Sequence, residues 1–251
     1  MQDNEKYILQ SVDNSLLVLE LFGKYKELGV SEVSELMNIG KSTAFRILAT
    51  LENRNYLLKQ ENSKYRLGLK LFSLGHVVRN ELLIKNHAYP FLKKLTTMTG
   101  ETSHLVIWYD TYNIIFIEKV LSSSSIRMHS HVGYVAKAHL TASGKALLSA
   151  CPDDEVRYYA DNTVFEQKTP TSIMTAAQLF ANIREIRENG YAMDDEESEA
   201  GLTCYAAPII DPLGHAIASI SISGPTQRML EKQEDHINWV KQIADEMKNT
   251  L

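Results

Sequence analysis

The sequence predicts an α+β fold in which an N-terminal winged helix-turn-helix domain is followed by a linker helix and a C-terminal antiparallel sheet with flanking helices. Three observations predict it. Helical patterns separated by a short turn precede two short strand patterns within residues 1–67. An apolar-rich helical pattern comes next. Beyond it, strand patterns occur as neighbouring pairs around polar turns, which is typical of an antiparallel sheet.

Length and composition indicate two domains. The chain has 251 residues, of which 44% are hydrophobic and 23% charged, so it can bury a sizeable core. We expect domains of about 80 and 170 residues. Residues 1–85 carry 12 Lys and Arg against 10 Asp and Glu, whereas residues 86–251 carry 14 against 21. A slightly basic domain joined to an acidic one fits a nucleic-acid module attached to another function.

The N-terminal sequence carries no targeting pattern. Its first residues, MQDNEKY, are polar and mixed in charge, and the apolar run SLLVLELF is short and interrupted by Glu20. We therefore expect neither a signal peptide nor a transmembrane helix, and a cytoplasmic protein. The two cysteines, Cys151 and Cys204, lack metal-pair spacing and are expected to be free thiols.

Two helices open the predicted first domain. Apolar residues between Leu16 and Phe22 mark the first helix, with a predicted cap near Asp13. After Gly29, the stretch SEVSELM has apolar residues at helical spacing over about two turns. Asn38 follows, and asparagine tolerates the left-handed conformation that a tight turn requires.

A third helix begins at Lys41 or Ser42 and completes a helix-turn-helix. Its apolar residues recur at i, i+3, i+4 and i+7, which predicts a buried stripe. The stripe consists of Ala44, Ile47, Leu48 and Leu51. In the helix-turn-helix arrangement, the start of this second motif helix is the part that enters a DNA major groove.

Two short strands then form a predicted wing. They lie at Tyr56–Lys59 and Lys64–Gly68, on either side of the polar stretch QENS. Exposed hydroxyl and guanidinium groups on the third helix can reach phosphates and base edges, and cations on the wing can meet the DNA backbone. The predicted DNA-binding residues are Lys41, Ser42, Thr43, Phe45, Arg46, Lys64 and Arg66.

The stretch IGKST also permits a second interpretation, a phosphate-binding loop. A Walker A loop needs G-x-x-x-x-G-K-S/T, because its first glycine opens the loop that surrounds the phosphates. The position five before Gly40 is Glu35. Such a loop also follows a buried strand, whereas the residues upstream have helical spacing. The pattern therefore favours DNA recognition over nucleotide binding.

The remaining elements are a linker helix, paired strands and four helical patterns. The apolar-rich helix from Leu69 to about Leu83 is a candidate dimer contact. One strand pair is predicted at 104–110 and 113–120, and a second at 202–210 and 215–223 around a turn at 211–214. The helical patterns cover roughly 86–99, 142–150, 175–189 and 226–248.

A small-molecule site is predicted where a Thr/Ser-rich turn starts an apolar helix, in the stretch TASGKAL from Thr141. The first backbone N–H groups of a helix have no partner within it, and the helix dipole is positive there, so this start can hold a carboxylate. Ser221 and Ser223 alternate along a predicted strand, which points both side chains to one face.

Several stretches, in the same order along the chain, resemble the IclR family of bacterial transcriptional regulators. They are NIGKSTAFRILATLENRNYL, KYRLGLKLFSLG, HLTASGKALLS and GYAMDDEESEAGLTCYAAPIIDPLGHAIASISISGPT, with a final helix after them. The resemblance covers nearly all of the chain. It implies a repressor or activator whose C-terminal domain, a GAF-like sheet with flanking helices, binds a small metabolite and sets the affinity for DNA.

The resemblance also implies an effector pocket. Matched residue by residue, the family's effector contacts fall on Ala142, Ser143, Asp194, Cys204, Ser221 and Ser223. Some members carry glycine where this chain has Ala142, and the extra methyl group narrows the pocket floor. The hydrogen-bonding groups and small walls of this set exclude a bulky nucleotide and leave sugar acids, keto acids and small aromatic acids as candidates. The first two are favoured because the set has several hydrogen-bonding groups and few aromatic surfaces.

The predicted protein is therefore a ligand-responsive DNA-binding regulator, most simply a repressor of a small organic-acid or sugar-acid catabolic pathway, which needs no cofactor. Its domains are a winged helix-turn-helix at 1–67, a linker helix at 68–84 and an effector domain at 85–251. A homodimer, or a pair of dimers, places two recognition helices on a palindromic operator, and the effector changes their spacing or stability.

The sequence also permits two other interpretations, a zinc protein and an enzyme. A zinc site would draw its ligands from His129, His131, His139 and Cys204. An enzyme would use Cys204 as a nucleophile on a small acid, with one of these histidines as base. The apolar sequence around Cys204 indicates a buried strand instead, where nothing recognisable activates the thiol.

Overall fold

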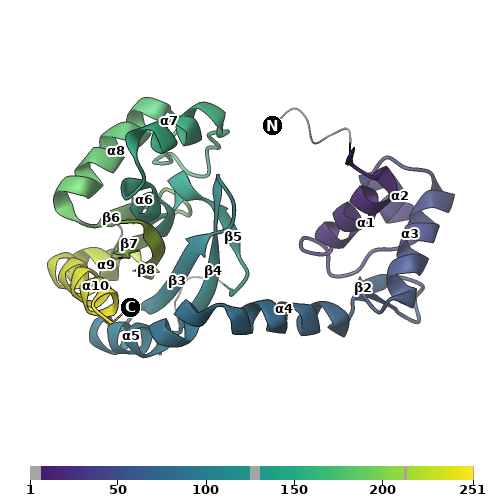
Figure 1. Cartoon of the computed structure of the whole chain (residues 1–251), viewed down its shortest axis with the longest axis horizontal. Helices are drawn as coiled ribbons and strands as arrows, with labels where there is room; N and C mark the ends of the chain where they lie inside the picture. Colours follow the sequence, from purple (N-terminus) through teal and green to yellow (C-terminus); the bar gives the residue numbers. More distant parts are fainter. Residues whose placement is uncertain (1–6, 125–130, 212–213, 251) are drawn as a thin grey trace. The chain divides into compact units, whose positions relative to one another are not determined.

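The computed structural model describes residues 7–124, 131–211 and 214–250. Contacts within the chain divide it into two compact units, Met1–Leu82 and Leu83–Leu251 (Figure 1). The first unit is helical with a two-stranded ribbon, and the second is built on an antiparallel sheet. Over the described residues, no helix has the length and apolar character needed to cross a membrane. The predicted α+β fold class is confirmed.

The first unit contains the predicted helix-turn-helix and wing. Asn38 has a φ of 51°, the left-handed conformation expected in the tight turn. The predicted cap near Asp13 is wrong, because the first helix begins at Gln10 after an extended Leu9. Asp13 lies instead in the first turn, where a carboxylate interacts favourably with the helix dipole. The elements are α1 Gln10–Leu21, α2 Val30–Leu36, α3 Lys41–Asn53, β1 Leu57–Lys59, β2 Tyr65–Leu67 and α4 Leu69–Glu81.

The buried stripe of α3 is confirmed and forms the centre of this unit's core. Burying an aliphatic side chain of this size stabilises the folded state by about 1.5–3 kcal/mol, so the stripe fixes which side of α3 stays outside. The wing strands pair in antiparallel register, with Leu57 opposite Leu67. The core residues are Val18, Phe22, Leu28, Val33, Ala44, Ile47, Leu48, Leu51, Leu57 and Tyr65.

Helix α4, which follows the wing, exposes an apolar surface. Leu69 is 85% exposed, Phe72 is 73% exposed and Val78 is 58% exposed. Leu74 and Val77 are exposed as well. Exposed apolar side chains gathered on one helix are a candidate protein–protein contact.

The second unit is layered around its sheet. Over the described residues the strand order is β5-β4-β3-β8-β7-β6, and every neighbouring pair is antiparallel. Helices α5 and α10 cover one face, and α6 covers the other, with α8 packed on α6 and α7 on α8 (Figure 1). The elements are α5 Leu83–Thr99, β3 Thr102–Trp108, β4 Asn113–Val120, β5 Val135–Lys137, α6 Ala142–Ser149, α7 Asp153–Asn162, α8 Ala176–Asn189, β6 Ala192–Asp195, β7 Leu202–Ile210, β8 Ala216–Pro225, α9 Thr226–Glu231 and α10 Gln233–Lys248.

The two predicted hairpins, β3–β4 and β7–β8, form the centre of the sheet. Strands β5 and β6 and helix α7 were not predicted. The edge strands β5 and β6 are too short to give an alternating pattern. Helix α7 was missed because its sequence, DDEVRYYADN, is mostly polar. The predicted helix at 226–248 is divided at Lys232 into α9 and α10. The predicted turn at 211–214 includes residues 212–213, which lie outside the described part.

Candidate functional site

The start of α3 presents the predicted DNA-reading side chains at the surface of the first unit. Gly40 precedes the helix in an extended conformation, and the buried stripe turns the opposite side of the helix outward. This side combines two cations, two hydroxyl groups and an aromatic ring, which suits contacts with phosphates, base edges and thymine methyl groups. The exposed residues are Lys41, Ser42, Thr43, Phe45 and Arg46.

The two wing cations have different surroundings. Lys64 Nζ lies 2.8 Å from Glu32 Oε1 at the start of α2. Glu32 Oε2 also accepts a hydrogen bond from the Gly29 N–H at 2.6 Å. The Lys64 bond, and then the Gly29 bond, lower the pKa of the Glu32 carboxyl. Lys64 thus ties the wing to α2, while Arg66 on β2 is exposed.

In the second unit, the six predicted effector residues line one small cavity between α6 and the sheet, which we call the inner cavity. Ala142 and Ser143 come from α6, and the others come from β6, β7 and β8. Its volume is about 20 Å³, room for a single water-sized group. The lining residues are His104, Phe116, Thr141, Ala142, Ser143, Asp194, Ser198, Cys204, Ser221 and Ser223.

Strand pairing brings these side chains into neighbouring rows. Asp194 lies opposite Cys204, and Cys204 lies opposite Ser223. His104 on β3 lies opposite Ser221 on β8. Side chains two residues apart on a strand share a face, so Ser221 and Ser223 both face α6. Four lining residues were absent from the predicted effector set, namely His104, Phe116, Thr141 and Ser198.

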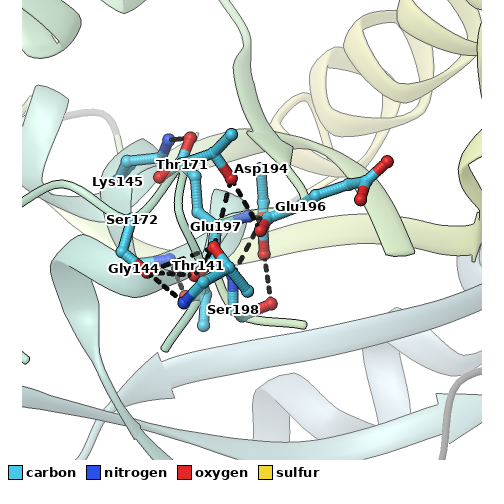
Figure 2. A network of polar contacts seen from close by, with 10 residues as sticks. Thr141, Gly144, Lys145, Thr171, Ser172, Asp194, Glu196, Glu197 and Ser198 are labelled. Atoms are coloured by element: carbon cyan, nitrogen blue, oxygen red, sulfur yellow. Dashed lines mark hydrogen bonds and ion pairs between the residues drawn. The ribbon is translucent and has the colours of Figure 1, made fainter. Parts of the chain in front are cut away.

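The Asp194 carboxylate is 1% exposed and is held by the turn that follows β6 (Figure 2). Its Oδ1 accepts hydrogen bonds from the N–H groups of Glu197 at 2.7 Å and Ser198 at 3.3 Å. Its Oδ2 accepts one from the Ser198 hydroxyl at 2.6 Å. Burial raises the pKa of Asp194 although these bonds favour its charged form. Asp194 therefore holds Ser198 at the wall of the inner cavity.

A buried ion pair connects the same turn to α6. The Lys145 side chain is fully buried, and its Nζ lies 2.5 Å from Glu197 Oε1. Burial raises the pKa of Glu197, and the Lys145 ammonium opposes that change. The Ser172 hydroxyl donates to the Glu197 carbonyl at 2.7 Å, and the Thr171 hydroxyl donates to the Glu196 carbonyl at 2.8 Å (Figure 2). The turn is thus fastened both to α6 and to the loop before α8.

The first turn of α6 depends on a cap and on a glycine. Thr141 Oγ1 accepts a hydrogen bond from the Gly144 N–H at 3.0 Å, an N-cap arrangement. A Cβ on Gly144 would lie 2.3 Å from the Ala138 carbonyl oxygen, because the 3₁₀ helix Ala138–Leu140 packs on this turn. The N–H groups of Ala142 and Ser143 precede the first intrahelical bonds, so the positive end of α6 borders the inner cavity.

The serine hydroxyls that α6 and β8 contribute to the inner cavity differ in their hydrogen bonding. The Ser143 hydroxyl donates to Ser221 Oγ at 2.9 Å. Ser223 is 1% exposed, and its Oγ has no hydrogen-bond partner among the residues that the structure describes. Leaving a buried hydroxyl without a partner costs about 1–3 kcal/mol.

His104 and Phe116 form the wall of the cavity on the β3–β4 side. Their rings meet edge to face, with centroids 5.3 Å apart. Burial, and to a smaller extent the charge of Lys119, lowers the pKa of His104 to about 3. The imidazole is therefore neutral near pH 7 and brings no positive charge to the cavity.

Among the groups considered for metal binding or nucleophilic catalysis, His139 and Cys204 are buried, whereas His131 is exposed. His139 Nδ1 lies 2.7 Å from the Tyr159 hydroxyl oxygen, and burial is the main cause that lowers the pKa of His139 to about 4. Burial likewise raises the pKa of the Cys204 thiol well above its usual value. Within the described part of the chain, no three His, Cys, Asp or Glu side chains are grouped closely enough to hold a metal ion. His129 lies outside the described residues.

Both units match one family of known proteins. Residues 76–249 match the family described as bacterial transcriptional regulator IclR C-terminal, and residues 11–61 match the IclR helix-turn-helix domain. The HTH-type transcriptional regulator KdgR of Escherichia coli is 35% identical over 233 residues, which cover 92% of this chain and 88% of KdgR. The HTH-type transcriptional repressor AllR of the same species is 29% identical over 224 residues, which cover 88% of this chain and 82% of AllR.

A solved structure agrees with these sequence matches. The crystal structure of the Thermotoga maritima IclR aligns with 96% of this chain and 98% of its own, with a TM-score of 0.77 and 32% identity. The chain belongs to the IclR family of bacterial transcriptional regulators. It is accordingly a DNA-binding regulator that responds to a ligand, and the comparisons give no support to an enzyme that uses Cys204.

Proposed function

We propose that this regulator is a repressor of a catabolic pathway for a small organic or sugar acid, and that the acid binds in the inner cavity and changes the affinity for the operator. Residues 1–67 bind DNA, residues 68–84 form the linker and residues 85–251 bind the effector. That this regulator represses transcription is supported by its relative AllR, which is a transcriptional repressor. The protein acts in the cytoplasm and catalyses no reaction.

The DNA-binding surface is the exposed start of α3 together with the wing. Lys41 and Arg66 contact phosphates, and Arg46 reads base edges in the major groove. The exposed apolar side chains of α4 support a homodimer, or a pair of dimers, that places two copies of α3 on a palindromic operator. Light scattering should then give at least twice the chain mass of 28.4 kDa, and a monomer at micromolar concentration would contradict the dimer.

The main support for the proposed effector site is the environment of the Ser223 hydroxyl. This hydroxyl is buried without a hydrogen-bond partner among the described residues, and it lines a cavity at the positive end of α6. A ligand oxygen that pairs with Ser223 Oγ removes the cost of that unpaired group, and a carboxylate is favoured beside the helix start. The Ser143–Ser221 hydroxyl pair lines the same cavity and adds further hydrogen-bonding atoms.

The test compares Ser223 with a matched serine on the same strand. Ser219 of β8 is also buried, and its hydroxyl also lacks a partner among the described residues, but it does not line the inner cavity. A panel of small hydroxy, keto and sugar acids is screened by thermal shift. An acid that binds the folded state raises the Tm of wild type and of Ser219→Ala. Ser223→Ala should lose most of that rise. An equal response of Ser223→Ala would place the effector elsewhere.

A further inference from the structure

A second pocket of the C-terminal unit is lined by α8, by β6 and by the turn after β6, and we call it the α8 pocket. It shares no lining residue with the inner cavity. Its volume is about 140 Å³, whereas one water molecule takes about 30 Å³ of liquid, so the pocket has room for a small organic group. Its lining residues are Asn182, Glu185, Ile186, Asn189, Tyr191, Met193, Asp195 and Glu197.

Two of these lining residues carry a buried oxygen atom that has no hydrogen-bond partner in the part of the chain that the structure describes. The atoms are Glu197 Oε2 and Asn182 Oδ1. Glu197 is 8% exposed, and its other carboxylate oxygen, Oε1, already pairs with Lys145. Buried polar atoms of native proteins almost always have a partner, so two orphaned acceptors at one pocket point to a bound molecule that supplies donors.

The charges around the pocket favour a cation as that molecule. Glu185 and Asp195 are exposed and bring two further carboxylates to its lining. None of the described lining residues is a lysine or an arginine. The Lys145 ammonium is buried on the Oε1 side of Glu197, where it compensates one carboxylate only. The remaining negative charge attracts a positive ligand and disfavours an acid.

The same carboxylates do not form a metal centre. Over the described residues, no three His, Cys, Asp or Glu side chains are close enough together to hold one metal ion. The acceptors are spread instead over a helix, a strand and a turn. An ammonium or guanidinium group suits this spacing, because each carries several N–H donors that point in different directions.

We propose that the α8 pocket is a second ligand site of this regulator, and that it binds a small alkylammonium or guanidinium compound. N–H groups of the ligand donate to Glu197 Oε2 and Asn182 Oδ1, and the carboxylates of Glu185 and Asp195 compensate its positive charge. This site differs from the inner cavity in its position and in the sign of the charge that it accepts.

The experiment measures the binding of small cations to the full-length protein by calorimetry at constant ionic strength. Methylguanidinium and agmatine are the probes, and both should bind. Tetramethylammonium has the same charge as methylguanidinium but no N–H donor, so it should bind about tenfold more weakly or not at all. Binding of tetramethylammonium or Mg²⁺ as tight as that of methylguanidinium would overturn the proposal, and so would the failure of both probes to bind.

Variants of the lining residues place the cation in the α8 pocket. Glu185→Gln, Asp195→Asn and Asn182→Ala should each weaken the binding of methylguanidinium about tenfold, the change expected when a hydrogen bond to a charged group is lost. The matched control is Glu188→Gln, which removes an exposed carboxylate from α8 that does not line the pocket. It should leave the dissociation constant unchanged. Equal affinities of the three variants and this control would show that the cation binds elsewhere.

A last variant separates this site from the proposed effector site. Ser223→Ala alters the inner cavity and should bind methylguanidinium as tightly as the wild type does. Loss of cation binding in Ser223→Ala would assign the cation to the inner cavity and overturn the second site. Because the probes are cations and no acid is present, the result does not depend on whether an acid binds beside Ser223.

Discussion

Replacing Lys145 with methionine tests the buried ion pair that fastens the turn after β6 to α6. The Lys145 side chain is 0% exposed and that of Glu197 is 10% exposed, so the pair is shielded from water. Removing one partner leaves a buried charge without compensation, which costs about 3–5 kcal/mol. For a unit of this size, that loss in the free energy of unfolding lowers the Tm by roughly 6–20 °C.

Tryptophan fluorescence can follow this unfolding, because both tryptophans, Trp108 and Trp239, belong to the second unit. The matched control is Lys94→Met, which breaks the exposed Lys94–Glu246 pair and should leave the Tm essentially unchanged. The double variant Lys145→Met with Glu197→Leu should recover most of the lost stability, since a hydrophobic pair can replace a buried ion pair. A Tm of Lys145→Met equal to that of the control would refute the reasoning.

The same variant has a predicted pH dependence. Burial already raises the pKa of Glu197 in the folded protein, and removing the Lys145 ammonium raises it further. A carboxyl whose pKa is higher in the folded than in the unfolded state contributes stability below the unfolded pKa of about 4.3, and that contribution is lost as the pH rises through the folded pKa. The Tm deficit of Lys145→Met relative to wild type should therefore shrink as the pH falls from neutral toward the unfolded pKa of about 4.3. A deficit that grows on acidification would contradict this sign.

Three further predictions concern other parts of the chain. Arg46→Ala should weaken specific operator binding by about 1–3 kcal/mol in an anisotropy titration while the Tm stays unchanged; equal affinity would remove Arg46 from the reading surface. Burial raises the pKa of Cys151 to about 11 and that of Cys204 well above its usual value, so iodoacetamide near pH 8 should modify both far more slowly in the native than in the urea-unfolded protein. Comparable rates would contradict their burial. Gly144→Ala should lower the Tm because its Cβ meets backbone at 2.3 Å, whereas Gly75→Ala, with open space around it in α4, should raise it slightly.

Elements whose apolar side chains repeat with a clear period could be predicted from the sequence. The stripe of α3 and the hairpin of β7 and β8 follow from local spacing, and the tight turn at Asn38 follows from the residue type. Edge strands of three or four residues, such as β5, show no such period. They form because their backbone groups hydrogen-bond to a neighbouring strand. Helix α7 is mostly polar, and its few buried side chains, among them Tyr159, give too weak a pattern.

The candidate site was only partly predictable for a related reason. Ser221 and Ser223 could be placed on one face from their spacing alone. His104 could not be added to them, because its position opposite Ser221 depends on the pairing of β3 with β8, strands more than 100 residues apart. The hydrogen bond from the Ser198 hydroxyl to Asp194 depends on the geometry of the turn after β6, and residue types alone do not determine that geometry.

The central claim is that an acid in the inner cavity changes the affinity of the winged helix for DNA. It is tested most directly by the operator dissociation constant, measured with and without a saturating concentration of the acid that most raises the Tm. An operator duplex is first selected from a random pool with the wild-type protein. The acid should change the operator affinity of wild type and of Ser219→Ala by about 5-fold or more, and that of Ser223→Ala much less. An operator affinity of the wild type that is the same with and without the acid would contradict the account.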